Sequence, residues 1–172
     1  SKDKIIFDVG HQSYTYKVLT GRSLDNLRKN IEVIKGFVNN NARICIPVKA
    51  NAYGHGATRV AIAAIKSGAD FLAVASIQEG IELREAGIVA PILSLSLPTP
   101  DEIPSIIVHS ITPLVFDPEF ITQLADAALK MHRTIPVHLK IDTGMGRIGF
   151  NCRCVESAKE QGDICEEICR LP

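Results

Sequence analysis

Short apolar runs alternate with amphipathic segments along most of the chain. Each apolar run has the length of a buried strand, and each segment between two runs repeats apolar residues at helical spacing. The expected strands span residues 44–49, 71–76, 91–96, 111–116 and 137–142. The expected helices span about 58–67, 77–86, 101–108, 118–131 and 155–171. Strands that alternate with helices pair in parallel through right-handed crossovers, so the pattern predicts an α/β fold.

The pattern before residue 44 is less regular. Residues 5–7 and 14–18 have strand-like composition, and a helical pattern begins near Ser23 and continues to Val38. We assign no function to residues 1–20 and treat them as an N-terminal extension. Residues 21–172 then form the main folded portion.

Five strand–helix units leave two architectures open, a doubly wound sheet and a TIM-type (β/α)8 barrel. A complete eight-fold barrel needs about 250 residues, whereas this chain has 172. If the fold is a barrel, it is incomplete and contains about five of the eight units. Its open strand edges would then need cover from further sequence or from another chain.

Composition narrows the classes of partner. Hydrophobic residues make up 46% of the chain and charged residues 22%, as in ordinary globular domains. Lysine plus arginine equals aspartate plus glutamate, at 19 each, so no net positive charge favours nucleic acid or an anionic membrane. The chain has no secretory-type segment and no apolar run of spanning length. We expect a soluble cytoplasmic protein whose partners are small molecules or other protein chains.

The cysteines raise the alternative of a metal site. There are five, an odd number without a secretory signal, which argues against a disulfide framework. Cys152 and Cys154, with Cys165 and Cys169, could in principle bind zinc. Neither spacing is the usual one for zinc, and the second pair lies on an apolar helical stripe, so we expect no metal.

The stretch at residues 47–56 contains the strongest candidate for chemistry. Lys49 lies at the C-terminal end of an expected strand, where α/β folds place their ligands. Lysine is rarely buried without a partner, and an amine in such a place is a typical nucleophile for carbonyl groups. Gly54 and Gly56 let the chain turn, and Tyr53 either binds an anion or simply packs. His55 is more typical of a turn or cap residue than of a base.

The expected strand at 137–142 is the second candidate. Its alternation places His138, Lys140 and Asp142 on one face, where three ionisable groups predict a polar functional cavity rather than a core. A solvated edge strand is the structural alternative.

Gly144, Gly146 and Gly149 after this strand match the dinucleotide-binding pattern G-x-G-x-x-G. That pattern should follow an apolar strand and lead directly into a helix, with an acidic residue at the end of the next strand. Here charged residues precede the turn, and Glu166 and Glu167 lie in a helical pattern. We therefore interpret the match as accidental.

The chain contains two long motifs in a specific order, PVKANAYGHG at 47–56 and HLKIDTGMGRIGF at 138–150. Together they resemble the N-terminal barrel domain of bacterial alanine racemases, which are pyridoxal-phosphate enzymes of fold type III. Residues 68–75 and 79–84 are also similar to that family. The resemblance covers residues 21–172 and implies the N-terminal part of a barrel that binds pyridoxal 5'-phosphate.

The resemblance also implies a role for each matching residue. Lys49 would form the covalent link to the cofactor and act as one of two bases, and Tyr53 would bind the cofactor phosphate. Arg147 would contact the cofactor phenolate oxygen and the substrate carboxylate, and Lys140, often carbamylated in the family, would orient Arg147. The second base, a tyrosine across a homodimer interface, and an arginine for the pyridine nitrogen match nothing in this chain.

The implied reaction of the full-length enzyme is interconversion of L-alanine and D-alanine, which supplies D-alanine for peptidoglycan precursors. We expect these 172 residues alone to be inactive. Two alternatives within the fold are a racemase for another amino acid, such as serine, and a non-catalytic barrel protein that binds pyridoxal phosphate.

Overall fold

The computed structural model describes residues 4–9, 12–17, 21–38 and 42–171. The chain divides into two compact units, Ser1–Leu72 and Ala73–Pro172. Strand β4 (Phe71–Val74) contains the boundary between them. No helix among the described residues is long and apolar enough to cross a membrane.

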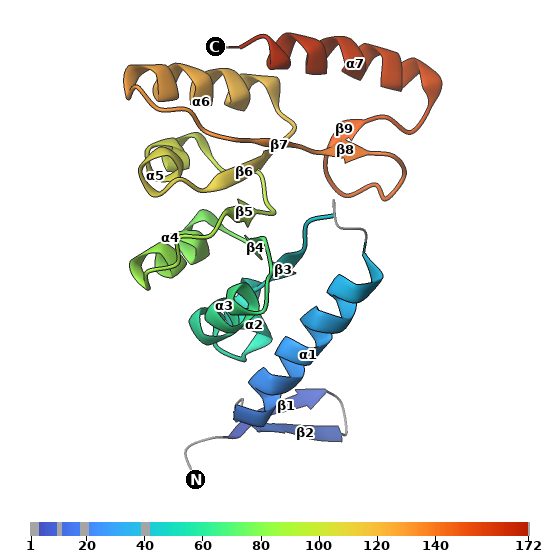
Figure 1. Cartoon of the computed structure of the whole chain (residues 1–172). Coiled ribbons are helices and arrows are strands. Elements are labelled where there is room, and N and C mark those ends of the chain that lie inside the picture. Colours follow the sequence, from blue (N-terminus) through green and yellow to red (C-terminus); the bar gives the residue numbers. More distant parts are fainter. Residues whose placement is uncertain (1–3, 10–11, 18–20, 39–41, 172) are drawn as a thin grey trace. The chain divides into compact units, whose positions relative to one another are not determined.

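The first unit begins with two strands and a long helix (Figure 1). Strands β1 (Lys4–Val9) and β2 (Gln12–Lys17) pair antiparallel, with Lys4 opposite Lys17. The strand-like composition near the N-terminus thus corresponds to real strands. Helix α1 (Gly21–Phe37) follows, buries Ile31 and packs against α3 (Ala57–Lys66).

The rest of the first unit is the first βα unit of the sheet. Strand β3 (Cys45–Pro47) leads through Val48 into α2 (Lys49–Tyr53) and then α3. Asp70 ties the start of β3 to the chain after α3, because its Oδ2 accepts a hydrogen bond from the Ile44 amide at 2.7 Å. The Ile44 carbonyl accepts in turn from the amides of Asp70 and Phe71.

The second unit repeats the strand–helix pattern. Its elements after β4 are α4 (Ile77–Glu85), β5 (Ile92–Ser94), η1 (Pro100–Glu102), α5 (Ile103–His109), β6 (Thr112–Val115), α6 (Pro118–Lys130) and β7 (His138–Leu139). Strands β5 and β6 pair in parallel, as do β6 and β7. Strands β3 to β7 follow one another in the sheet in sequence order. The predicted α/β fold with about five parallel units is confirmed, and among the described residues the five strands form an open sheet.

The helices of the second unit begin where the sequence supplies caps. The Ser76 hydroxyl accepts from the Glu79 amide, which is a free amide in the first turn of α4. The Glu79 carboxylate accepts in return from the amide of Ala75, the residue before the cap, at 2.7 Å. Asp117 accepts from the Glu119 amide at the start of α6. These caps fix where each helix leaves its strand.

The predicted single strand at 137–142 is wrong, because the chain forms two short strands there. The segment β7 pairs with β6, and β8 (Ile141–Asp142) pairs in parallel with β9 (Phe150–Asn151) (Figure 1). The loop at 143–149 contains three glycines with positive φ, which let the chain double back beside itself. Helix α7 (Val155–Cys169) follows and packs against α6.

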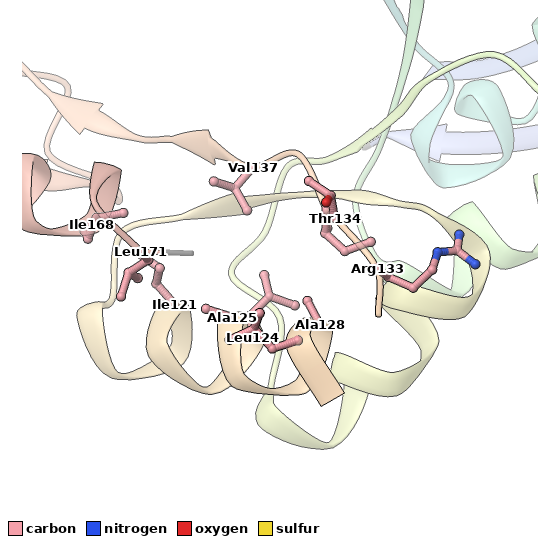
Figure 2. Close-up of a pocket in the computed structure, with 11 residues that line it drawn as sticks. Ile121, Leu124, Ala125, Ala128, Arg133, Thr134, Val137, Ile168 and Leu171 are labelled. Carbon is pink, nitrogen blue, oxygen red and sulfur yellow. The ribbon is translucent and has the colours of Figure 1, made fainter. Parts of the chain in front are cut away.

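An apolar cavity of about 200 Å³ lies beside α6 in the second unit (Figure 2). Its lining includes Ile121, Leu124 and Ala128 of α6, Val137, and Ile168 and Leu171 near the chain end. None of the residues that the sequence predicts to be functional lines it.

Candidate active site

Lys49 lies just beyond the C-terminal end of β3, separated from it by Val48, and is the first residue of α2 and not the last residue of the strand as predicted. Its side chain is half-buried, whereas the preceding Val48 is fully buried. Among the residues that the structure describes, no hydrogen bond or ion pair involves the Lys49 amine. The amine is therefore anchored through its backbone and remains available to a ligand.

The turn after Lys49 is left-handed, which the sequence reasoning did not predict. Ala50, Asn51 and Ala52 have φ of 50–52° and ψ of 43–49°, and Tyr53 has φ of 54°. A left-handed conformation costs a residue other than glycine about 1–2 kcal/mol. The glycines that were expected to make the turn only continue it, since Gly54 and Gly56 also have positive φ.

Hydrogen bonds within the turn offset this cost. The Ala52 amide donates to the Val48 carbonyl at 2.8 Å, and the Gly56 amide donates to the Asn51 carbonyl at 3.0 Å. The Asn51 side-chain Oδ1 accepts from the Ala57 amide at 2.8 Å and so caps α3. The His55 ring Nδ1 lies 2.8 Å from the Ala52 carbonyl oxygen, in agreement with its interpretation as a turn residue.

Tyr53 borders a cavity of about 360 Å³ within the first unit. The cavity is lined by Asn26 and Asn30 of α1, Pro47 of β3, and His55. Tyr53 is 59% exposed, so its hydroxyl is accessible to an anion rather than buried in the core. Lys49 does not line this cavity.

The other two predicted residues lie in the second unit. Lys140 is half-buried between β7 and β8, and its Nζ donates to the Ile141 carbonyl at 2.8 Å. Arg147 lies in the loop at 143–149, where its side chain is exposed and its Nη2 contacts the Met145 sulfur at 3.4 Å. His138, Lys140 and Asp142 do not share one environment, since they are exposed, half-buried and buried respectively.

Asp142 is the best-connected group of this second half. Its carboxylate is 2% exposed and accepts hydrogen bonds from the Gly144 amide at 3.0 Å and from the Gly146 amide at 3.0 Å. The Arg153 guanidinium binds it through Nε at 2.9 Å and through Nη2. These donors hold the pKa of the Asp142 carboxyl well below its usual range. Sequence reasoning missed Arg153. The one available signal was that a buried carboxylate such as Asp142 needs a cation beside it.

The same contacts exclude the dinucleotide alternative. The Gly144 and Gly146 amides, which a pyrophosphate would need, donate to Asp142 instead. The loop also leads into β9 and not into a helix.

The cysteines form no metal centre within the described ranges, where no group of three or more histidine, cysteine, aspartate or glutamate side chains could hold a metal ion. Burial and the neighbouring thiols of Cys152 and Cys169 raise the pKa of the Cys165 thiol. Cys152, Cys165 and Cys169 are free thiols.

Parallel β/α units whose strands follow one another in sequence order, without the reversal of a doubly wound sheet, define an α/β domain of the barrel type. The chain belongs to the alanine racemase family, because the family model for "Alanine racemase, N-terminal domain" matches residues 23–169.

Curated relatives agree with this assignment. An alanine racemase of Treponema denticola is 60% identical over 136 residues, which cover 79% of this chain and 35% of that protein. An alanine racemase of Synechocystis is 47% identical over 121 residues, which cover 70% of this chain and 32% of that protein. The chain spans about a third of the length of these relatives.

Solved structures are similar too. An alanine racemase of Clostridium difficile 630 in complex with cycloserine matches with a TM-score of 0.79 and 40% identity, over 87% of this chain and 40% of that one. A histidine racemase of Leuconostoc mesenteroides matches with a TM-score of 0.73 and 29% identity, over 86% of this chain and 38% of that one.

Proposed function

We propose that the protein to which this chain belongs is a pyridoxal-phosphate-dependent racemase that interconverts L-alanine and D-alanine. The observation that carries the proposal is Lys49, an amine without a partner among the described residues, held by a left-handed turn at the end of β3. Family membership and relatives named alanine racemase support the substrate. We also propose a cytoplasmic enzyme that acts as a homodimer, with residues 21–172 as the N-terminal part of the barrel.

The residues present fit pyridoxal phosphate. The Lys49 amine can bond covalently to an aldehyde, and the exposed Tyr53 hydroxyl can donate to the phosphate. The exposed Arg147 guanidinium can hold the phenolate oxygen and a substrate carboxylate. Tyr53 and Lys49 belong to the first unit and Arg147 to the second, so their union in one site is part of the proposal.

When bound, the cofactor supplies an electron sink that stabilises the charge left on the substrate Cα after its proton is removed. The protein supplies orientation and proton transfer. Lys49 takes or returns the Cα proton on one face. Arg147 binds the carboxylate so that the Cα–H bond points at Lys49. Lys140, once carbamylated, would carry a negative charge and hold the Arg147 guanidinium.

An absorption spectrum of the full-length protein with pyridoxal phosphate tests the role of Lys49. We expect a visible band from lysine-bound cofactor together with conversion of L-alanine to D-alanine. Both should be lost in Lys49→Ala, because no other amine replaces the covalent link. Lys66→Ala, which removes an exposed lysine of α3, is the matched control and should keep both. A band that persists unchanged in Lys49→Ala would refute the assignment.

A second candidate is a racemase for a different amino acid. The similarity to a histidine racemase at 29% identity favours it, since the same fold serves another side chain there. Rates with alanine, serine and histidine on the full-length protein discriminate, and a preference for alanine is expected. Cofactor binding without racemisation of any amino acid would favour a non-catalytic binding protein.

A further inference from the structure

The loop at 143–149 carries Arg147 and is built around one buried carboxylate. A carboxylate that is 2% exposed is stable as an anion only if hydrogen bonds and a cation replace its lost hydration. Asp142 has both, through two loop amides and the fork of Arg153. The loop backbone and the ion pair are therefore parts of one arrangement.

The two amides that Asp142 binds lie directly before Arg147. Gly144 and Gly146 flank Met145, and their positive φ of 147° and 75° turns both N–H groups toward the same carboxylate. The Gly146 amide belongs to the Met145–Gly146 peptide, one peptide before Arg147, so its bond to Asp142 restrains the backbone from which the Arg147 Cα–Cβ bond leaves the loop.

The loop is also held after Arg147. The Phe150 amide donates to the Lys140 carbonyl at 2.8 Å, and the Cys152 amide donates to the Asp142 carbonyl at 3.0 Å. Phe150 is buried, so this return of the chain is anchored in the core. Between the two anchors the Arg147 side chain itself stays exposed. The backbone is thus held on both sides of an accessible guanidinium.

Arg153 supplies the cation of this arrangement. Its guanidinium forms two bonds to the same Asp142 oxygen and lies under Gly146, where a methyl group would meet Nη2 at 3.5 Å. Without that cation the buried carboxylate would take up a proton or move toward water, and either change weakens its bonds to the loop amides.

We propose that Asp142 and Arg153 form a positioning pair that sets the direction of Arg147, and thereby how tightly Arg147 binds an anionic group. Within the described residues no hydrogen bond or ion pair joins Arg153 to Arg147, so Arg153 acts through Asp142 and the loop. The consequence for ligand binding rests on the proposed function, whereas the consequence for the loop does not.

Hydrogen exchange in the full-length protein without ligand tests the first consequence. In Arg153→Met we expect the Gly144 and Gly146 amides to exchange at least about tenfold faster, because their acceptor is no longer held. Arg170→Met is the matched control, since Arg170 forms only an exposed pair with Glu166, and it should leave both amides unchanged. Unchanged protection of both amides in Arg153→Met would overturn the pairing.

Steady-state kinetics and the cofactor spectrum test the second consequence. Arg153→Met should raise KM for the amino acid about tenfold, a larger change than that in kcat, and shift the absorption of bound cofactor. Arg153→Lys keeps the charge without the fork, so it should recover part of both effects, and it replaces Arg153→Met if that variant does not fold. A loss of thermal stability with unchanged KM and spectrum would overturn the positioning role. If the wild-type protein neither binds cofactor nor racemises, the proposed function fails while the exchange result still stands.

Discussion

Gly149 lies where no other residue fits. Its φ is 123°, and a methyl group there would stand 2.9 Å from the Lys140 carbonyl oxygen and 3.0 Å from the Asp142 nitrogen. Both neighbours are backbone atoms, which cannot move aside as the end of a side chain can. The glycine is thus required for the close approach of β9 to β8.

Replacement of Gly149 by alanine should reduce the free energy of unfolding by about 1–3 kcal/mol, because the φ value and the contact are both unfavourable. Chemical denaturation measures the change. Gly162→Ala is the control, since Gly162 lies inside α7 with nothing within 4 Å of an added methyl group. That variant should gain up to about 1 kcal/mol from helix propensity. Equal stability of the two variants would contradict the close approach.

Single residues also mark the limit of what the sequence predicts. Lys49 and Tyr53 could be singled out because a strand end and a glycine-rich turn are visible as patterns. The pairing of Asp142 with Arg153 could not, because the two side chains are eleven residues apart with a loop and a strand between them. A contact of this kind depends on the path of the backbone, which composition and spacing do not fix.

Among the elements, α4 has the clearest reason for its position. The Arg84 guanidinium near its C-terminus donates to the carbonyl oxygens of His109 at 2.9 Å, Ile88 at 2.8 Å, Ala90 at 2.7 Å and Ser110 at 3.0 Å. The first and last of these carbonyls end α5, and the other two lie in the connection to β5. One side chain thus joins three segments of the second unit.

Arg84→Lys should lower the free energy of unfolding by about 2 kcal/mol, because an ammonium has three donors and cannot reach four diverging carbonyls, and bonds from charged donors contribute about 1.5–3 kcal/mol each. Thermal and urea unfolding measure the loss. Arg59→Lys, on the exposed face of α3, is the control and should change stability by less than about 0.5 kcal/mol. A similar small change in both variants would show that the four bonds add nothing.

Regular elements are the part of the fold that the sequence predicts best. Between residues 44 and 131 every expected strand and helix lies within about two residues of the observed one, because buried strands and amphipathic helices leave a periodic signal. No periodic signal in the sequence indicates that residues 137–142 divide into two strands, β7 and β8. The three loop glycines permit a tight loop, but their spacing alone does not say that the strand after the loop pairs in parallel with the strand before it.

At the scale of the whole molecule, the predicted functional residues are divided between two compact units. The chain spans about a third of the length of its curated relatives, and the partner base and the arginine for the pyridine nitrogen that the family resemblance implies match none of its residues. The two-base scheme that the family resemblance implies needs a base on each face of the substrate. The open sheet agrees with the expectation that further residues complete the site, because its outer strands have edges that need cover.

We therefore expect the 172-residue chain on its own to form no D-alanine from L-alanine, whereas the full-length protein does. A coupled assay for D-alanine at equal protein concentrations measures the difference. Addition of excess pyridoxal phosphate should not restore activity, because the two groups that match none of the residues, a second base and an arginine for the pyridine nitrogen, are protein side chains and not the cofactor. Turnover by the isolated chain would contradict the assignment of the second base to another part of the protein.

The left-handed turn after Lys49 has a consequence for the order of events during folding. Unfolded chains avoid successive left-handed residues, so the turn has almost no population until Val48 and Ala57 at its two ends are in place. We therefore expect Lys49 to reach its final position late, after β3 and α3 have formed. Substitutions in the turn should accelerate unfolding and leave the folding rate unchanged, and a slower folding rate would contradict this order.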